Sequence, residues 1–358
     1  MRIGIDISQI SYEGTGVGRF TRGLTEAILA SSGLHEWVFF HSSLRRGFDE
    51  DIKKRIIKNG HTFKKWPVPP KILSVLWNNM HSMSIDTILG QLDWFITSDW
   101  TEPPAQTKKA TIVHDLTFKR YPETVETGVK NTQESRMKWV AKESSLIFAD
   151  SEATKKDLKE YYSLPESSIV VNYPGVGIVK PSSKKIPSLN RPFILTVGKL
   201  EPRKNINRLI EAYEKWGNRK VDLVIVGPKG WGDVSTKKSE SIHFLGHVTD
   251  GELASLYSSC LFFIFPSIWE GFGYPLVEAM SMGAPAATSS TSSLKEIGED
   301  ASLFFDPHST ESIIRAMDRL ATDSRLRNEL KEKGLKKAKE FTWKRYVEKM
   351  IRELEVRS

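Results

Sequence analysis

Two glutamates eight residues apart enclose a glycine-containing loop in the C-terminal half of this 358-residue chain. Residues 270–278 read Glu-Gly-Phe-Gly-Tyr-Pro-Leu-Val-Glu and follow an apolar run at 261–265. A glycine loop that leads into a helix presents backbone N–H groups and the positive end of the helix dipole, which suit a phosphate or diphosphate. Pro275 favours the first turn of such a helix. Because carboxylates accept strong hydrogen bonds, Glu270 suits the hydroxyls of a sugar and Glu278 those of a ribose.

A second candidate segment, at 197–205, reads Val-Gly-Lys-Leu-Glu-Pro-Arg-Lys-Asn and lies between an expected strand and an expected helix. Arg203 and Lys204 at the helix entrance would neutralise a departing diphosphate. Lys199 competes for the same role, and we favour Arg203 because its forked guanidinium binds two oxygens at once. Taken singly, each segment also has a plain interpretation, as loop glycines with surface acids or as a solvated basic pair. Their combination favours a nucleotide-diphosphate site.

Glycines and a histidine in the N-terminal half also follow expected strands. Residues 14–18 read Gly-Thr-Gly-Val-Gly, which lacks the G-x-G-x-x-G spacing of a dinucleotide fingerprint. We expect a glycine turn at Gly16 that lets a ligand approach the backbone closely. A lone histidine such as His114 is more often structural than catalytic, but its place at the carboxyl end of a strand favours function. Val248, in the strand-end loop at 244–248, suits contact with a nucleotide base.

No metal site or cofactor is expected. The eight histidines show no paired ligand spacing, and no Asp-x-Asp triplet indicates a magnesium-diphosphate clamp. Basic residues and a helix dipole would then neutralise the diphosphate. The single cysteine, Cys260, adjoins the apolar run at 261–265 and is expected to be a small buried side chain.

The elements that must position these residues alternate between short apolar runs and amphipathic helices, which predicts an α/β fold with parallel sheets. The expected strands are 2–7, 37–41, 93–97, 111–114, 146–150, 169–172, 193–197, 222–226, 242–245, 261–265 and 284–288. The pattern restarts after a polar, proline-punctuated linker at 181–191. We therefore expect two Rossmann-like domains, at 1–180 and 192–340, that face each other across a cleft. A last helix at 341–358 has no strand partner in the sequence.

Charge and hydropathy restrict the environment. The formal net charge is +8, and residues 45–71 hold nine Lys or Arg against three acids. No nucleic-acid recognition motif accompanies this basic segment. Aromatic and aliphatic residues follow it at 66–77, which suits peripheral contact with an anionic membrane, whereas the alternative is a solvated loop leading into a core helix. With neither a signal peptide nor a membrane-spanning run evident, we expect a cytoplasmic protein.

These segments together resemble the retaining glycosyltransferases of family 4, which have the GT-B fold. The resemblance covers nearly the whole chain and is carried by motifs at 14–18, 113–117, 149–154, 173–176, 200–205, 244–248, 270–280, 292–301 and 305–307. The pair Glu270 and Glu278 is the most specific of them. Many relatives carry Arg where this chain has Lys199, which leaves the phosphate roles of Lys199, Arg203 and Lys204 unordered.

The resemblance implies a role for each candidate residue. Glu270 would contact the hydroxyls of the donor sugar, and Glu278 the nucleotide ribose. His114 would touch the transferred sugar, and Gly16 would lie beside the diphosphate. The remaining diphosphate contacts implied are Gly273, the backbone at Tyr274, Pro275 and Leu276, and the side chains of Arg203 and Lys204. The last helix would cross back onto the N-terminal domain.

The implied activity is retaining transfer of a hexose from a nucleotide-diphosphate sugar to a hydroxyl of a glycan or lipid-linked acceptor. The motif variants look most like mannosyltransferases, so GDP-mannose is the leading donor, with UDP-glucose and other hexose donors open. A sugar-nucleotide epimerase, a phosphorylase and a non-catalytic nucleotide-sugar binder are the competing classes. An epimerase would turn over nucleotide sugar without an acceptor, a phosphorylase usually needs pyridoxal phosphate, and a binder would not need candidate residues in both domains.

Overall fold

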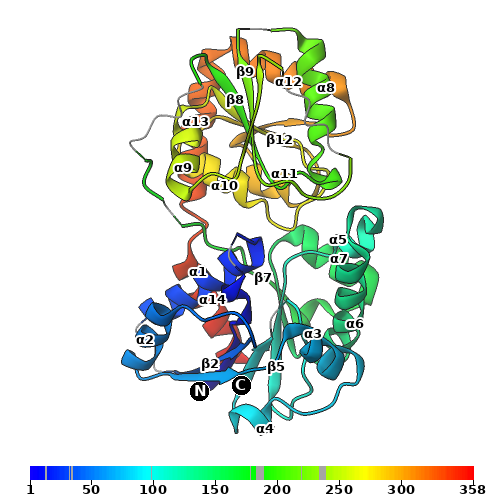
Figure 1. The fold of residues 1–358 in the computed structure, drawn as a ribbon, viewed down its shortest axis with the longest axis vertical. Coiled ribbons are helices and arrows are strands. Elements are labelled where there is room, and N and C mark those ends of the chain that lie inside the picture. The colour runs from blue at the N-terminus through cyan, green and yellow to red at the C-terminus, as the bar shows by residue number, and fades with distance from the viewer. Residues whose placement is uncertain are drawn as a thin grey trace. The chain divides into compact units, whose positions relative to one another are not determined.

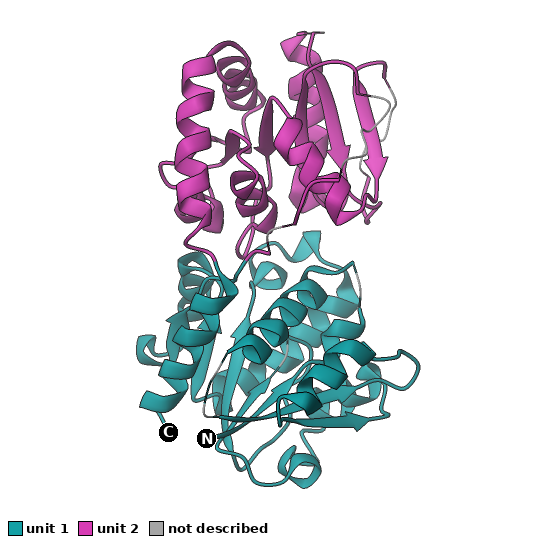
Figure 2. Cartoon of the chain, turned by 90° about the vertical axis from the view of Figure 1, so that its left-hand side faces the viewer, with its two compact units in different colours: residues 1–175, 342–358 teal, residues 176–341 magenta. Residues whose placement is uncertain are grey.

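The computed structural model of the chain describes residues 1–12, 14–31, 33, 35–97, 99–177, 179–182, 189–218, 220–233 and 239–358. They form two compact units, coloured separately in Figure 2. Unit 1 comprises Met1–Gly175 and Thr342–Ser358, and unit 2 comprises Val176–Phe341. Most of the expected linker, at 183–188, lies outside the described residues.

Unit 1 contains, within its described residues, one seven-stranded parallel sheet in the order β3-β2-β1-β4-β5-β6-β7 (Figure 1). Its strands are β1 (Arg2–Asp6), β2 (Glu36–Ser42), β3 (Thr62–Trp66), β4 (Trp94–Thr97), β5 (Lys108–Val113), β6 (Leu146–Ala149) and β7 (Ile169–Val171). The direction of strand addition reverses between β1 and β4, which makes this point the switch point of the sheet. Ligands of open α/β sheets bind beyond the carboxyl ends of strands at such a point.

The helices of unit 1 cover both faces of this sheet, as a parallel sheet requires. They are α1 (Gly16–Ala30), α2 (Glu50–Lys58), α3 (Pro70–Leu73), the π-helical η2 (Ser74–Asn79), α4 (Asp86–Leu89), α5 (Thr117–Arg120), α6 (Thr127–Glu143), α7 (Glu152–Tyr162) and α14 (Trp343–Val356). Short 3-10 turns occur at η1 (Ser8–Ser11), η3 (Pro122–Thr124) and η4 (Glu166–Ser168).

The last helix, α14, packs against α1. Trp343 lies so close to Gly23 that a Cβ built there would be 2.3 Å from the indole, and at Gly175 it would be 2.1 Å from the Trp343 nitrogen. The Asn172 side chain also donates to the Tyr346 carbonyl at 3.1 Å. These close contacts require glycine at both positions and attach the end of the chain to unit 1.

Unit 2 contains, among its described residues, a six-stranded parallel sheet in the order β10-β9-β8-β11-β12-β13. The strands are β8 (Phe193–Val197), β9 (Asp222–Val226), β10 (Ile242–Gly246), β11 (Phe262–Phe265), β12 (Ala286–Ser289) and β13 (Ser302–Phe305). The helical elements are η5 (Pro202–Lys204), α8 (Ile206–Trp216), α9 (Asp250–Ser259), α10 (Tyr274–Ser281), α11 (Ser292–Gly298), α12 (Thr310–Thr322) and α13 (Ser324–Ala338). The switch point of this sheet lies between β8 and β11.

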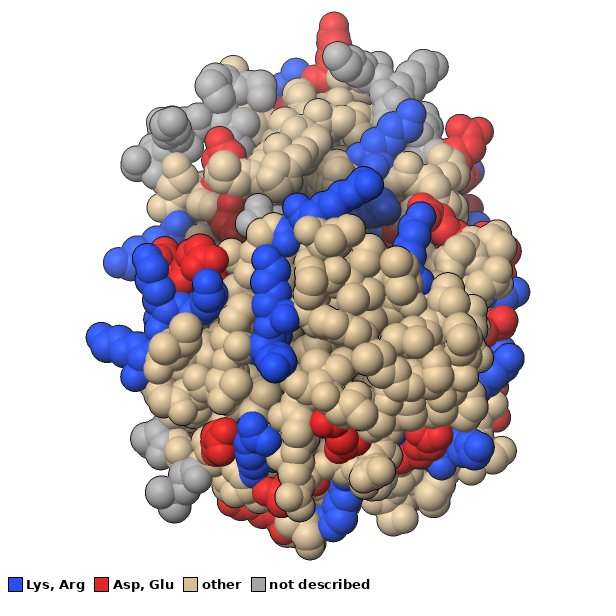
Figure 3. All heavy atoms as spheres, turned by 60° about the horizontal axis from the view of Figure 1, so that its bottom comes forward, with Lys and Arg blue, Asp and Glu red and all other residues tan. Residues whose placement is uncertain are grey.

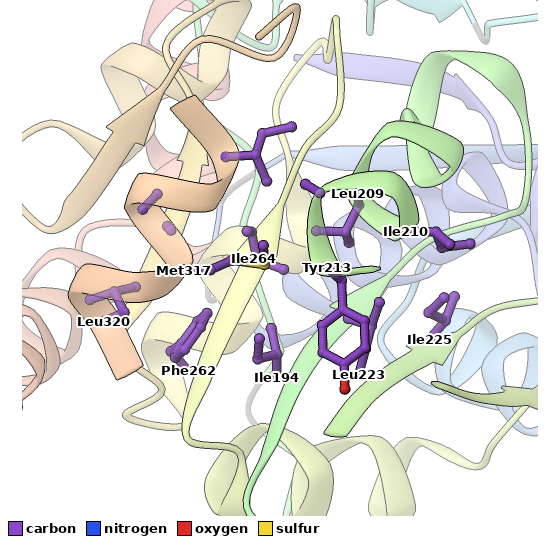
Figure 4. Packing of buried hydrophobic residues seen from close by; sticks show 14 of the residues in the cluster. Ile194, Leu209, Ile210, Tyr213, Leu223, Ile225, Phe262, Ile264, Met317 and Leu320 are labelled. Atoms are coloured by element: carbon purple, nitrogen blue, oxygen red, sulfur yellow. The ribbon is translucent and has the colours of Figure 1, made fainter. Parts of the chain in front are cut away.

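The core of unit 2 fixes α8 and α12 on the sheet (Figure 4). Tyr213 of α8 lies beside Leu223 and Ile225 of β9, and it is 1% exposed. Its hydroxyl donates to the Val221 carbonyl at 2.7 Å, so the buried oxygen is satisfied. Each fully buried side chain of this kind stabilises the fold by about 1.5–3 kcal/mol. The core thereby holds rigid the strand ends that carry the candidate site.

The two parallel-sheet units expected from the sequence are confirmed, and all eleven expected strands are present. Two strands were missed, the edge strands β3 and β13. The alternative interpretation of residues 45–71 was a solvated loop leading into a core helix. The loop was wrong, because the segment contains α2 and β3, whereas the helical residues that follow do enter the core through Leu73 and Trp77. In the part of the chain that the structure describes, none of the helices combines the length and the apolar character needed to cross a bilayer.

Candidate functional site

The loops that follow β8 and β11 meet at the switch point of unit 2. The two strands are hydrogen-bonded neighbours, with Phe262 opposite Ile194 and Phe263 opposite Leu195. The loop after β8 carries Arg203 and Lys204, and the loop after β11 carries Glu270. The Ile268 backbone N–H donates to the Arg203 carbonyl at 2.9 Å, which ties the loops together.

Glu270 is held between the two basic side chains. Its Oε2 accepts from Arg203 Nη1 at 2.8 Å, and its Oε1 accepts from Lys204 Nζ at 2.6 Å. Burial alone would raise the pKa of the Glu270 carboxyl, but the charges of Arg203 and Lys204 lower it to about 2. Burial lowers the pKa of Lys204, and the Glu270 charge opposes this change. The three groups therefore form a buried charge cluster, which suits a site that receives a charged ligand.

The backbone of Glu270 is also fixed. Its N–H donates to Ser292 Oγ at 3.1 Å, and its carbonyl accepts from Ser293 Oγ at 2.9 Å. Ser292 has a φ of 54°, an uncommon conformation for a residue other than glycine, asparagine or aspartate. Such backbone strain is retained where the surrounding structure imposes it, often at functional positions.

The three basic residues, Lys199, Arg203 and Lys204, differ in their contacts. Arg203 Nη1 donates to the Trp269 carbonyl at 2.6 Å, and its Nη2 donates to Glu201 Oε1 at 2.9 Å. Lys199 is exposed, and its Nζ lies 4.5 Å from the centroid of the Trp231 ring. Arg203 and Lys204 thus belong to the buried cluster, whereas Lys199 contacts an aromatic ring outside it. Glu201 and Trp231 were not identified from the sequence.

Gly273, the N-cap of α10, brings the backbone close to its surroundings. Its φ is 96°, and a Cβ there would lie 2.6 Å from Leu294 Cδ2, so only glycine fits. Gly273 has no side chain to cap the first-turn N–H groups of α10. Tyr274 and Pro275 begin the helix; Pro275 has no N–H, and the Leu276 N–H donates to the Gly273 carbonyl at 3.0 Å. The first turn of α10 therefore lacks a side-chain cap at the positive end of the helix dipole.

Glu278 lies on α10, one turn further along. Its Oε2 accepts from the Tyr257 hydroxyl of α9 at 3.1 Å. The loop before α9 contains Val248, which is half-buried. The bond between Tyr257 and Glu278 thus fixes α10 against the helix that follows the Val248 loop. No motif in the sequence pointed to Tyr257.

His114 lies directly after β5 in unit 1 and contacts a residue directly after β6. Val113 of β5 pairs with Ala149 of β6, so the next residues, His114 and Asp150, are neighbours. His114 Nδ1 lies 2.7 Å from Asp150 Oδ2. Burial alone would lower the pKa of His114, but the carboxylates of Asp150, Asp99 and Asp115 raise it to about 9. The surrounding carboxylates therefore favour the imidazolium over the neutral ring.

A small cavity adjoins this histidine at the switch point of unit 1. Its volume is about 20 Å³, and Gln9, Asp99 and His114 are among its lining residues. The Gln9 side chain is buried, and neither of its amide atoms has a hydrogen-bond partner among the described residues. Asp99, Gln9 and Asp150 were not assigned roles from the sequence, although each lies beyond the carboxyl end of a strand.

Gly16 is the first residue of α1, and Thr15 caps this helix by accepting from the Gly18 N–H at 3.1 Å. A Cβ built on Gly16 would meet no atom within 4 Å, and its φ is not positive. The structure of unit 1 alone therefore does not require glycine here, so the space beside Gly16 suits the approach of a ligand.

The basic segment at 45–71 includes α2 and β3. Leu44, Ile57, Ile72, Val75, Met80 and Met83 in and beside this segment are about half or more exposed. Figure 3 shows Lys and Arg side chains together with Asp and Glu side chains on a face that is otherwise uncharged. Basic and exposed apolar side chains thus occur together in and beside residues 45–71. Within the described residues, no group of three or more His, Cys, Asp or Glu side chains is placed to hold a metal ion.

Two family models match adjacent parts of the chain. Residues 14–179 match the model described as "Glycosyltransferase Family 4", and residues 180–337 match the model "Glycosyl transferases group 1". Together they span the loops after β1, β5, β8, β10 and β11 that carry the candidate residues.

Individual relatives agree with these matches. The chain is 25% identical to "O-antigen chain mannosyltransferase B" of Escherichia coli, over 96% of both chains. It is 34% identical to "Serotype-specific mannosyltransferase WbdA" of Escherichia coli over 55% of this chain, which spans 27% of that relative. The structure of sucrose-phosphate synthase from Thermosynechococcus elongatus has the same fold, with a TM-score of 0.74, 16% identity and full coverage of both chains.

Proposed function

Because this chain belongs to glycosyltransferase family 4 and has the GT-B fold, we propose that it is a retaining mannosyltransferase. It transfers mannose from GDP-mannose to a hydroxyl of a glycan or lipid-linked acceptor in surface polysaccharide biosynthesis. The names of both relatives support mannose as the sugar, and the name of the first supports O-antigen chains as the class of product. The identities to these relatives are 25% and 34%, so the identity of the donor sugar nucleotide is tested first.

The observation that carries this proposal is the cluster of Glu270, Arg203 and Lys204 at the switch point of unit 2. A diphosphate competes with Glu270 for the two cations, because phosphate oxygens form the same charge-assisted bonds as a carboxylate. When the diphosphate takes over Arg203 and Lys204, the Glu270 carboxylate becomes available to the sugar hydroxyls. Binding of the donor and orientation of its sugar are coupled in this way.

The transfer itself forms a bond between the acceptor oxygen and the anomeric carbon and breaks the bond from that carbon to the phosphate oxygen. The acceptor attacks from the face on which the diphosphate departs, so the anomeric configuration is retained. The acceptor proton passes to an oxygen of the departing phosphate. The protein accelerates this step by stabilising the developing diphosphate charge with Arg203, Lys204 and the α10 dipole.

This arrangement supplies the charge neutralisation that a metal ion supplies in other sites, and we propose that transfer needs neither a metal nor a cofactor. Two cations and a helix N-terminus face the diphosphate, and charge-assisted bonds of this kind contribute about 1.5–3 kcal/mol each. The readout is activity in the presence of a chelator. Transfer that stops with EDTA and returns with Mg²⁺ or Mn²⁺ would contradict this part of the proposal.

For the location we propose peripheral contact between the basic segment at 45–71 and the inner face of the cytoplasmic membrane, where lipid-linked acceptors are presented. Its net positive charge and the exposed apolar side chains beside it support this contact. Charge reversal at Lys53, Lys54 and Lys58 of α2 should release the protein from anionic vesicles. Unchanged binding to such vesicles would remove the membrane from the proposal.

Thermal stabilisation by GDP, UDP, ADP and their sugars, measured with EDTA present, tests the donor. A ligand at about 100 times its Kd stabilises the native state by about 2.7 kcal/mol, which corresponds to a shift of about 5–10 °C. We expect this shift with GDP and GDP-mannose. A shift with UDP ligands alone would make the protein a UDP-sugar transferase of the same fold, and turnover without an acceptor would indicate an epimerase.

A further inference from the structure

The contact between His114 and Asp150 has no part in the transfer mechanism proposed above. Asp150 is 2% exposed, and its Oδ2 is 2.7 Å from His114 Nδ1. Its other oxygen, Oδ1, has no hydrogen-bond partner among the described residues. Thr154 Oγ1 donates to the His114 carbonyl at 3.1 Å, which fixes the backbone of the histidine. The carboxylate therefore serves the imidazole rather than a helix cap or a basic residue.

The ring of His114 is held from a second side. The Phe20 ring of α1 packs edge-on against it, with 4.5 Å between ring centroids. Phe20 in turn contacts Trp343 and Tyr346 of α14, at 5.1 and 5.6 Å. With Nδ1 occupied by Asp150, the ring presents Nε2 at its opposite edge, and within the described residues Nε2 has no hydrogen-bond partner. His114 also lines the cavity at the switch point.

The charges around the ring come from several elements. Asp150 follows β6, Asp99 follows β4 by two residues, and Asp115 follows His114 itself; all three favour the imidazolium. Arg136 of α6 faces Asp99, at 3.5 Å from its Oδ1, and offsets part of that charge. Asp6 of β1 lines the same cavity. Burial raises the pKa of both Asp150 and Asp99, an effect that the imidazolium opposes.

We propose that Asp150 is a positioning residue that holds His114 by Nδ1 as a cation and so presents Nε2–H as a hydrogen-bond donor to a substrate hydroxyl. The inference rests on the proposed function, because it takes from the family resemblance that His114 contacts the transferred sugar. A cationic donor binds an oxygen more strongly than a neutral one, roughly twofold in energy. Below the pH at which the cation is lost, the ring keeps its positive charge, and Nε2 remains the nitrogen that donates to the substrate.

The pH dependence follows from the sign of the shift. Because Asp150, together with Asp99 and Asp115, outweighs burial and raises the pKa of His114 to about 9, the donor is present below that pH and is lost as the pH rises through it. Without the Asp150 charge, burial lowers the pKa of the imidazole. The alkaline limb of kcat should then move down by about two pH units, and kcat at pH 8 should fall by about 10-fold.

The test compares Asp150→Asn with Asp157→Asn in the full-length protein. Asp157 of α7 is a matched control because it is equally buried, pairs through Oδ1 with Arg120 at 2.9 and 2.6 Å, and also has one oxygen without a partner among the described residues. Asp150→Glu, which restores the carboxylate, should keep the alkaline limb near that of the wild type. The KM for the donor should change less than kcat, since the nucleotide binds in unit 2.

A readout independent of transfer is the titration of His114 by NMR of ¹⁵N-labelled histidine, with its resonance identified by loss in His114→Gln. We expect a wild-type pKa of about 9 and a pKa lower by one unit or more in Asp150→Asn. The proposal is overturned if wild-type His114 titrates near its ordinary value. It is equally overturned if Asp150→Asn lowers kcat uniformly across pH, as Asp157→Asn would through lost stability alone. Absence of transfer by the wild type would contradict the proposed function, whereas the NMR titration of His114 would still decide the role of Asp150.

Discussion

The strand-end sites of the two units are built by the same rule but carry opposite charge balances. In unit 2, Glu270 faces Arg203 and Lys204, and Glu201 faces Arg203, so carboxylates and cations are matched. In unit 1, His114 faces Asp150, Asp99 and Asp115, of which Asp99 also meets Arg136. In the matched cluster of Glu201, Arg203, Lys204 and Glu270, a diphosphate can replace a carboxylate as the partner of the cations. In unit 1, the excess of carboxylates keeps the histidine protonated. We therefore propose that the site of unit 2 binds an anion and that the site of unit 1 presents one hydrogen-bond donor.

The largest expected effect comes from breaking the matched cluster at its centre. Glu270→Ala should lower kcat by about 10³-fold, because the donor sugar loses the carboxylate that orients it. Nucleotide affinity should not weaken, since Arg203 and Lys204 lose a competitor for the diphosphate. Steady-state kinetics and GDP titration check the two halves. Glu299→Ala, which removes an exposed glutamate paired with Lys337, is the control; an equal loss of nucleotide affinity in Glu270→Ala would show that its role is misassigned.

A smaller loss is expected when one cation of the cluster is neutralised. Arg203→Gln should reduce kcat/KM by about 10²-fold, because the departing diphosphate loses a charged donor in a buried site. Lys199→Gln should change kcat/KM by no more than about 3-fold, because Lys199 is exposed and lies outside the cluster. Comparable losses in both variants would remove the distinction that the contacts draw between these residues.

Glu278 tests whether donor binding and catalysis are separable within unit 2. Glu278→Gln should weaken donor binding by about 10-fold with kcat nearly unchanged, as expected when a bond is present equally in ground state and transition state. Tyr257→Phe removes the hydroxyl that donates to Glu278 and should weaken donor binding by a smaller factor. An unchanged donor Kd in Glu278→Gln would refute the ribose assignment.

Two glycines sharpen the comparison through stability. Gly273→Ala should destabilise the fold by about 1–3 kcal/mol, because its positive φ and the 2.6 Å approach to Leu294 both exclude a Cβ. Gly16→Ala should leave the free energy of unfolding nearly unchanged, because the added methyl meets no protein atom. It should reduce transfer, because the methyl occupies the space through which the ligand approaches. Chemical denaturation measures both. Wild-type activity in Gly16→Ala would mean that no ligand approaches this position.

The sequence predicted strand ends well because buried parallel strands are short apolar runs with glycine, proline or acidic residues after them. It missed β3 and β13 for a local reason. β3 is an edge strand whose exposed Lys64 and Lys65 interrupt its apolar residues, and β13 is an edge strand whose apolar run is limited to Leu303–Phe305, with its two central residues only half-buried.

The contacts within each site could not be predicted in the same way. The pair of His114 and Asp150 is separated by 36 residues and that of Arg203 and Glu270 by 67. Each pair meets only because the strand order makes β5 a neighbour of β6 and β8 a neighbour of β11. Motifs locate residues after strands, but which strands adjoin depends on packing of the whole sheet. Glu201, Asp150 and Tyr257 were missed for that reason.

The most direct test of the central claim is calorimetric titration of GDP into the wild-type protein and into Arg203→Gln, both in EDTA. If the matched cluster of unit 2 is the diphosphate site, the wild type binds GDP without metal, and the variant binds it about 10-fold or more weakly. GDP binding that needs a metal ion, or that is equal in the two proteins, would contradict the account.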